Sequence, residues 1–246
     1  MEEEDGFQKI ESLVWDDSVK HLEKLYKEYP SESECFALEN DRVVAKVDLP
    51  ARMTLMELVE TDMSSLASYV RCSNESFNAK LIPLVLDGKK RVFVELLEDL
   101  QEGKEVVIQQ PISKESVPLV LVKRVNDEEK PYFGQRGLFA SSFIGHGEIV
   151  SEYLGLVRMA DASIRSEYVV IFPNSFAEDQ TYHVRIDAWK MGNESRFINH
   201  SEDENNCEFN WRWIKGELRL LIVAIRDIQE GEEILVEYGN GFFKKR

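Results

Sequence analysis

The segment "RFINHS", residues 196–201, places polar side chains on either side of two apolar residues, Phe197 and Ile198. A surface loop would be polar throughout, whereas a core strand would not hold this many hydrogen-bonding groups. Buried polar groups need hydrogen-bond partners. The segment therefore predicts a buried polar junction, whose partners are either other protein groups or a ligand. The side chains that could do chemistry there are Arg196, Asn199, His200 and Ser201.

Three other segments of the second half carry comparable signals. "GQRGLFA" (134–140) places glycines around a turn before a strand, where the backbone can approach a ligand closely. "GEIVSEYLG" (147–155) predicts a turn and then a strand. "RDIQEGEEILVEYG" (226–239) predicts a strand, a glycine turn and a second strand that ends on Tyr238. Taken singly, each also fits an ordinary turn, core histidine or strand tyrosine; their order along one chain favours a ligand site.

Composition and charge restrict the classes of partner. The chain has 246 residues and 43% hydrophobic residues, enough for one large domain or two small ones. Its net charge of −16 repels a nucleic-acid backbone and attracts basic proteins, although an acidic surface also simply aids solubility. No apolar run reaches the roughly 20 residues of a membrane span. The three cysteines are too scattered for a disulfide framework or a four-thiolate zinc site, so no metal is predicted.

The local patterns predict a helix followed by many strands. Apolar residues at three- and four-residue spacing predict a helix within residues 1–31, which Pro30 ends. They are Phe7, Ile10, Val14, Leu22, Leu25 and Tyr26. Short apolar or alternating segments then predict strands: "RVVAKVDL", "RVFVELLEDL", "EVVIQQ" and "PLVLVKRV". The linker-like "NDEEKPYFGQ" (126–135) leads into the second strand-rich half.

The second half repeats the first. Residues 88–110 align without gaps on residues 216–238, and "RCSNES" (71–76) resembles "RFINHS". Residues 42–59 similarly resemble residues 137–154. Three similarities in the same order predict a tandem duplication, unless strand–turn–strand segments resemble one another by chance. In this alignment Glu75 and Gln110 replace His200 and Tyr238, so we expect the first copy to be structural and the second to do the chemistry.

The motifs together resemble the SET-domain family of protein lysine methyltransferases, over about residues 132–243. The order is G-x-x-G-L-F-A, G-E-x-x-x-E-Y-x-G, G-N-x-x-R-F-I-N-H-S and G-E-E-[IL]-x-x-x-Y-G. The resemblance implies a mostly β (α+β) fold of several small curved sheets, with a knot-like core where the N-H-S segment and the final tyrosine strand thread together. We expect an N-terminal helical segment (1–31), a degenerate SET-like β region (32–112) and a catalytic SET domain (113–246).

The same resemblance implies S-adenosylmethionine as the cofactor and gives each site residue a role. Tyr238 would be the catalytic tyrosine, beside the sulfonium and the incoming lysine nitrogen, and Tyr168 would pack nearby as the second catalytic residue. Asn199 and His200 would bind the adenine end of the cofactor. The full set of implied cofactor-binding residues is Gly134, Gln135, Arg136, Tyr168, Arg196, Phe197, Asn199, His200, Tyr238 and Phe242.

Departures from the family leave two functions open. The zinc-binding cysteine clusters of many members are absent, and Glu202 and Glu204 stand where Cys and Pro are frequent. "ILVEYG" is similar to the PR-type subgroup, whose activity varies. The first function is methyl transfer to lysines of a histone or another basic protein, in the nucleus or alternatively the cytoplasm. The second is a non-catalytic module that binds basic protein partners. Neither involves direct nucleic-acid or membrane binding, and the oligomeric state is not encoded in these patterns.

Overall fold

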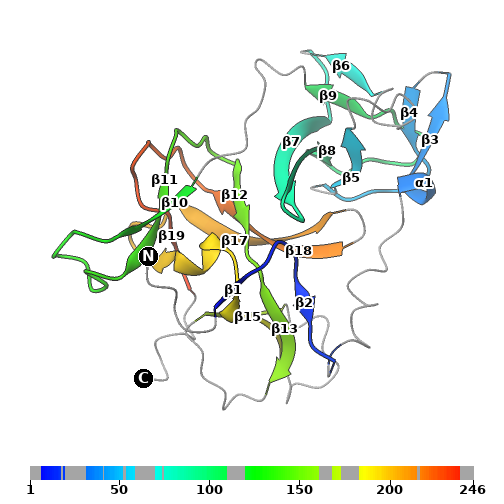
Figure 1. Ribbon diagram of the computed structural model, residues 1–246. Coiled ribbons are helices and arrows are strands. Elements are labelled where there is room, and N and C mark those ends of the chain that lie inside the picture. Colours follow the sequence, from blue (N-terminus) through cyan, green and yellow to red (C-terminus); the bar gives the residue numbers. More distant parts are fainter. Residues whose placement is uncertain are drawn as a thin grey trace. The chain divides into compact units, whose positions relative to one another are not determined.

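The chain forms two compact units, which are described separately (Figure 1). Unit 1 comprises residues 1–23, 118–210 and 220–246, and unit 2 comprises residues 24–117 and 211–219. The computed structural model describes residues 7–17, 19, 32–40, 42–51, 54–58, 70–73, 75–109, 120–160, 168–172, 183–214 and 217–238. Strands dominate them, which confirms the mostly β prediction. No helix in these ranges is long and apolar enough to cross a membrane.

Unit 1 holds a five-stranded sheet, in which β1, β15, β13 and β2 are neighbours in that order and β14 also pairs with β15. Their bounds are Gln8–Lys9 (β1), Val14–Trp15 (β2), Gly155–Ala160 (β13), Val169–Ile171 (β14) and His183–Gly192 (β15). The antiparallel pair β10 (Val120–Arg124) and β11 (Arg136–Ala140) lies separately. The predicted linker 126–135 is therefore the loop of this pair, inside one unit.

The remaining elements of unit 1 carry the RFINHS and tyrosine segments. The 3-10 helix η4 (Glu194–Phe197) leads into β16 (Asn199–His200), which pairs in parallel with β19 (Leu235–Val236). Beside them, β12 (Ile149–Glu152) pairs with β18 (Glu217–Ala224), and β18 is the neighbour of β17 (Cys207–Ile214). Residues 211–219, at the turn end of β17 and β18, belong to unit 2.

Unit 2 is a curled sheet around an apolar core. Its strand order is β5-β8-β7-β9-β6, with a two-stranded β3–β4 sheet and the short helix α1 (Glu32–Cys35). The core includes Phe36, Met56, Val94 and Val106. The strand bounds are Phe36–Glu39 (β3), Arg42–Ala45 (β4), Thr54–Leu58 (β5), Arg71–Ser73 (β6), Ala79–Leu86 (β7), Lys89–Leu96 (β8) and Val107–Gln109 (β9). These strands, with β10, confirm the predicted strand segments.

The predicted N-terminal helix is wrong where the structure describes it. Residues 8–9 and 14–15 are strands, paired in parallel with β15 and β13. The Ile10 N–H donates to the Gly192 carbonyl oxygen at 2.9 Å and the Asp16 N–H to the Val157 carbonyl oxygen at 2.9 Å. The edges of an existing sheet thus bind this backbone, and tertiary pairing overrides the helical spacing. Leu22, Leu25 and Tyr26 lie outside the described residues.

Each unit contains the same set of strand pairs and bridging hydrogen bonds, which we call the frame. In unit 2 the Asn78 Nδ2 donates to the Glu105 carbonyl oxygen at 2.9 Å, and in unit 1 the Asn206 Nδ2 donates to the Glu233 carbonyl oxygen at 2.7 Å. Ala45 and Ala140 likewise bond to Lys104 and Glu232 at 2.9 Å each. The β5–β8 and β12–β18 pairs have a register shift at the same place, before Met56 and before Ser151. Both units therefore contain the same strand pairings and hydrogen bonds at these positions.

The frame corrects one part of the sequence alignment. In unit 2, Arg71 pairs with Val107 and Cys72 with Ile108, whereas in unit 1 Asn199 pairs with Leu235 and His200 with Val236. Cys72, not Glu75, is therefore the counterpart of His200. Aligning residues 71–76 with residues 196–201 by their shared Arg, Asn and Ser places Glu75 opposite His200. This alignment differs by three residues from the one that the backbone pairing gives.

The units differ most between the strands of this frame. Unit 1 inserts β13, β14, β15 and η4 between β12 and β16. The corresponding stretch of unit 2, residues 59–70, is much shorter. The insert also provides the edges on which β1 and β2 pair.

Candidate active site

Tyr238 lies just after β19 and is held by residues in and next to β16, the strand that pairs with β19. Its backbone N–H donates to His200 Nδ1 at 3.0 Å, and its hydroxyl donates to the Ile198 carbonyl oxygen. The two rings lie 5.2 Å apart between centroids. Since Nδ1 accepts a hydrogen bond, the neutral His200 carries its proton on Nε2. The His200 side chain and the Ile198 backbone carbonyl thus hold Tyr238, the predicted catalytic tyrosine, in place.

Asn199 ties three segments together. Its Nδ2 donates to the Arg136 carbonyl oxygen at 3.2 Å and to Glu233 Oε1 at 2.8 Å. Burial raises the pKa of the Glu233 carboxyl, although the Asn199 hydrogen bond opposes this effect. A Cβ at position 137 would lie 2.5 Å from Glu233 Oε1, so a larger residue there would displace the carboxylate that Asn199 binds. Both amide hydrogens of Asn199 are therefore used within the protein, so any hydrogen bond from an adenine amino group would go to its Oδ1.

Arg196 lies at the centre of an aromatic cluster. Its guanidinium carbon is 4.4 Å from the Phe7 ring centroid, 4.4 Å from that of Tyr168 and 5.0 Å from that of Phe197. Arg196 is only 3% exposed, and its Nη2 donates to the Trp189 carbonyl oxygen at 3.0 Å. The ring faces of these aromatics stabilise the buried positive charge. The structure thus brings the predicted residues Tyr168, Arg196 and Phe197 together.

The third predicted group, Gly134 to Arg136, lies in the loop before β11 and at its first residue. Gly134 has φ +78°, and its carbonyl oxygen accepts from Arg124 Nη1 at 2.9 Å. The Gln135 carbonyl oxygen accepts from the Val125 N–H at 2.8 Å. Each carbonyl has a second lone pair for a ligand. The Arg136 guanidinium lies over the Phe197 ring at 5.3 Å, which connects this loop to the aromatic cluster.

Two further residues belong to the site but were not predicted. Tyr153 is 5% exposed, and its hydroxyl donates to the Tyr168 carbonyl oxygen at 3.1 Å. Burial, with a contribution from Tyr238, raises the pKa of the Tyr153 hydroxyl far above neutral. The motif "GEIVSEYLG" contains Tyr153 and could have identified it. Phe7 could not have been found, because nothing in the sequence links it to Arg196.

Other predictions concern residues beyond this cluster. Phe242 lies outside the described residues. In the part of the chain that the structure describes, no group of three or more His, Cys, Asp or Glu side chains could hold a metal ion. Cys35, Cys72 and Cys207 are free thiols.

Comparison with known proteins finds matches for part of the chain. Residues 135–239 match the family model for the SET domain. N-lysine methyltransferase KMT5A-A of Danio rerio is 38% identical over 112 residues, which are 43% of this chain and 32% of that protein. Histone-lysine N-methyltransferase Set2 of Drosophila melanogaster is 33% identical over 111 residues, 42% of this chain and 4% of that protein. The chain thus spans a third or less of the length of these relatives.

Solved structures give a weaker likeness. The structure described as "ctPRC2 in an autoinhibited conformation bound to S-adenosylmethionine" aligns with 52% of this chain and 16% of its own, at 28% identity and a TM-score of 0.41. A TM-score this low adds nothing to the sequence match. That match, together with the motifs, identifies a SET domain over residues 135–239.

Proposed function

Because residues 135–239 form a SET domain, we propose that this protein transfers methyl groups from S-adenosylmethionine to lysine side chains of a protein substrate. The observation that carries the proposal is the position of Tyr238, whose hydroxyl is held by the Ile198 carbonyl and whose backbone is held by His200. Relatives named as lysine methyltransferases match 43% and 42% of the chain.

The residues of the site fit the cofactor. S-adenosylmethionine, when bound, supplies an electrophilic methyl group on a positively charged sulfonium. Carbonyl and hydroxyl oxygens are suitable neighbours for such a group, because they accept weak C–H···O hydrogen bonds. The Ile198 carbonyl and the Tyr238 hydroxyl supply these oxygens. Arg136, Asn199 and His200 would hold the rest of the cofactor, with Phe197 as an apolar wall.

The residues would act by alignment rather than by acid–base chemistry. Methyl transfer to an amine is an in-line displacement, so precise placement of the two reactants can contribute several kcal/mol. Tyr153 stays protonated at neutral pH, since burial raises the pKa of its hydroxyl. A neutral, apolar surrounding favours the uncharged form of a lysine amine, which is the form that attacks the methyl group.

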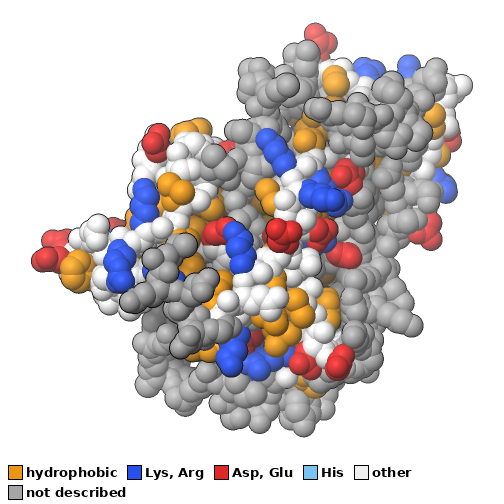
Figure 2. Space-filling view, viewed as in Figure 1, with side chains coloured by type: hydrophobic (Ala, Val, Ile, Leu, Met, Phe, Trp, Pro, Cys, Tyr) orange, Lys and Arg blue, Asp and Glu red, His pale blue; other side chains and the backbone are white. Residues whose placement is uncertain are grey.

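We propose a basic protein, and a histone in particular, as the substrate, which would place the protein in the nucleus. Charge supports this, since the chain carries 46 acidic and 30 basic residues. On the side seen in Figure 2, however, red and blue side chains are interspersed. Local contacts near the site, rather than the overall charge, would therefore select the lysine.

Methyl transfer can be measured directly with the full chain. Radiolabelled S-adenosylmethionine is incubated with core histones and with a panel of lysine-rich proteins, and the labelled residue is identified by mass spectrometry. We expect label on lysine, and much less of it with the Tyr238→Phe variant. Cofactor binding without transfer to any protein would instead support the alternative, a non-catalytic module that binds basic partners. Calorimetry of S-adenosylmethionine binding separates these two outcomes from a chain that binds no cofactor.

A further inference from the structure

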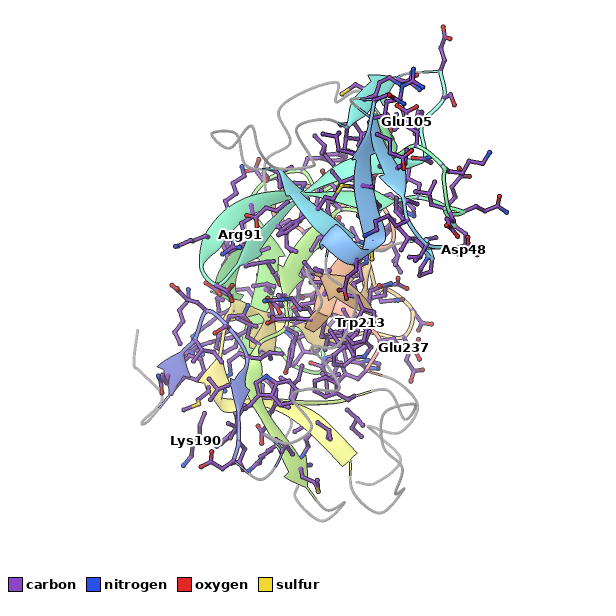
Figure 3. All side chains as sticks on the ribbon, turned by 90° about the vertical axis from the view of Figure 1, so that its right-hand side faces the viewer. Asp48, Arg91, Glu105, Lys190, Trp213 and Glu237 are labelled. Atoms are coloured by element: carbon purple, nitrogen blue, oxygen red, sulfur yellow. The ribbon has the colours of Figure 1, made fainter. Side chains whose placement is uncertain are left out.

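The N-terminal segment, residues 7–15, contributes strands β1 and β2, which pair with β15 and β13 of the insert in unit 1. β1 pairs in parallel with β15, with Gln8 opposite Met191 and Lys9 opposite Gly192. Figure 1 shows β1 and β2, in dark blue, beside β15 and β13. Figure 3 labels Lys190, the β15 residue that directly precedes this pairing. The family match begins only at residue 135, so it does not include this segment.

Phe7 is the residue of this segment that contacts the candidate site. Its ring covers the Arg196 guanidinium at 4.4 Å, the same distance as the Tyr168 ring. An ion pair between Lys9 Nζ and Glu194 Oε1 links β1 to η4, the helix that carries Arg196. The Ile10 N–H bond to Gly192 fixes the backbone next to it. Phe7 is therefore held against Arg196 by contacts on its C-terminal side.

The physical effect of Phe7 follows from the burial of Arg196. A guanidinium over an aromatic face is stabilised more strongly when it is desolvated than when it is exposed to water. Arg196 is 3% exposed, so the Phe7 ring acts on a desolvated charge. Without the Phe7 ring, one neighbour of the guanidinium would be water, and the side chain could shift relative to Tyr168 and Phe197.

We propose that Phe7 is a positioning residue of the methyltransferase site: it orients Arg196, and through it Tyr168 and Phe197. The site is then assembled from two distant parts of the chain, which unit 2 separates in sequence. The consequence for cofactor binding rests on the proposed function, whereas the ordering of η4 by Phe7 does not.

Four variants of the full chain test the proposal. Phe7→Ala removes the ring, Phe7→Leu fills the space without an aromatic face, and Phe7→Tyr keeps the ring. Val14→Ala is the matched control, since it shortens a side chain of β2, elsewhere in the same segment. Two quantities are measured for each variant: amide hydrogen exchange of residues 191–198 by mass spectrometry, and the Kd of S-adenosylmethionine by calorimetry.

We expect Phe7→Ala and Phe7→Leu to speed exchange at residues 191–198 and to raise the Kd at least about fivefold, because Arg196 loses one of the rings that hold it in place. Phe7→Tyr and Val14→Ala should stay near wild type in both. Unchanged exchange at residues 191–198 in Phe7→Ala would overturn the proposal, even if the wild type bound no cofactor. An unchanged Kd in both Phe7→Ala and Phe7→Leu would also overturn it. Absence of wild-type binding, with exchange altered as expected, would count against the proposed function alone.

Discussion

The two units use the same backbone frame for different purposes. Both have the β-strand pairs, the bridging asparagine and the glycine turn at Gly103 or Gly231, with φ of +78° and +84°. Among the described residues, the insert that carries Tyr168, Arg196 and Phe197 is found in unit 1. The candidate site thus consists of the insert together with a few frame positions of that unit.

The frame positions that differ lie in or beside the parallel strand pairs β16–β19 and β6–β9. In unit 1 the Glu233 carboxylate accepts from the Asn199 amide, and Gly137 leaves room for it. In unit 2 the counterpart Glu105 forms ion pairs with Arg71 at 3.1 Å and with Arg42 at 3.7 Å. At the frame positions of Asn199 and Gly137, unit 2 thus has Arg71 and Arg42, whose largely exposed side chains pair with Glu105. We take this as the mark of a copy that serves as scaffold.

The largest expected effect concerns a contact inside unit 2, between its main segment, residues 24–117, and its second segment, residues 211–219. Glu95 is 3% exposed and forms an ion pair with Arg212, which is 7% exposed. Glu95→Ala leaves a buried arginine without this carboxylate, so we expect a loss of about 3–5 kcal/mol in the free energy of unfolding, measured by denaturant titration.

A double variant sharpens this test, because the other unit supplies the replacements. The frame counterparts of Glu95 and Arg212 are Val223 and Leu84, both buried. Glu95→Val combined with Arg212→Leu should therefore recover most of the loss. The same contact predicts that the isolated fragment 113–246, which lacks Glu95, is unstable. A fragment as stable as the full chain would contradict the scaffold role.

The bridging asparagines provide a matched pair. Asn78 and Asn206 each accept from one backbone N–H at 2.9 Å, that of Val107 or Leu235, and each donates to a glutamate carbonyl. Replacement of either by alanine leaves two backbone groups unpaired, so we expect about 2–3 kcal/mol of destabilisation in each case. Only Asn206→Ala should also weaken S-adenosylmethionine binding in the remaining folded protein. A large loss at one site and none at the other would contradict the shared frame.

Tyr238→Phe should affect activity rather than folding. The ring remains beside His200, but the hydroxyl that bonds to the Ile198 carbonyl is lost. We expect kcat to fall at least tenfold, about 1.4 kcal/mol of barrier, with the melting temperature and cofactor affinity nearly unchanged. Gln110→Ala, at the counterpart position in the first copy, is the control and should leave kcat as it is. Wild-type turnover by Tyr238→Phe would refute the assigned role.

The smallest expected effects concern Glu105 of unit 2 and its frame counterpart in unit 1, Glu233. Glu105→Gln removes two ion pairs and should cost about 1 kcal/mol of stability at neutral pH. At Glu233, burial raises the pKa, so the ionised carboxylate destabilises the folded state once the pH rises above the usual value of 4.5 and through the raised pKa. Glu233→Gln should therefore be neutral or slightly stabilising at neutral pH, and equal to wild type in acid. Thermal unfolding at several pH values measures both variants.

Much of this arrangement could be predicted from the sequence. The strand segments, the repeat and the conjunction of His200 with Tyr238 follow from local pattern and motif order. The N-terminal strands could not be predicted, because the edges of β13 and β15 determine them and the local spacing of Phe7, Ile10 and Val14 favours a helix. The counterpart of His200 could not be predicted either. The sequence alignment matches Arg71 with Arg196 by residue type, whereas the backbone pairing makes Cys72 the counterpart of His200. The division into segments 1–31, 32–112 and 113–246, and the roles of individual site residues, stay predictions.

The central claim is that one of the two frames binds the cofactor. Isothermal titration calorimetry of the full chain with S-adenosylmethionine tests it. The same titration is made with the variants Cys72→Ala and His200→Ala, which change equivalent positions of the two units. The account predicts one equivalent of bound cofactor, strongly weakened by His200→Ala and unaffected by Cys72→Ala. Two equivalents, no binding, or a loss of affinity in Cys72→Ala alone would contradict it.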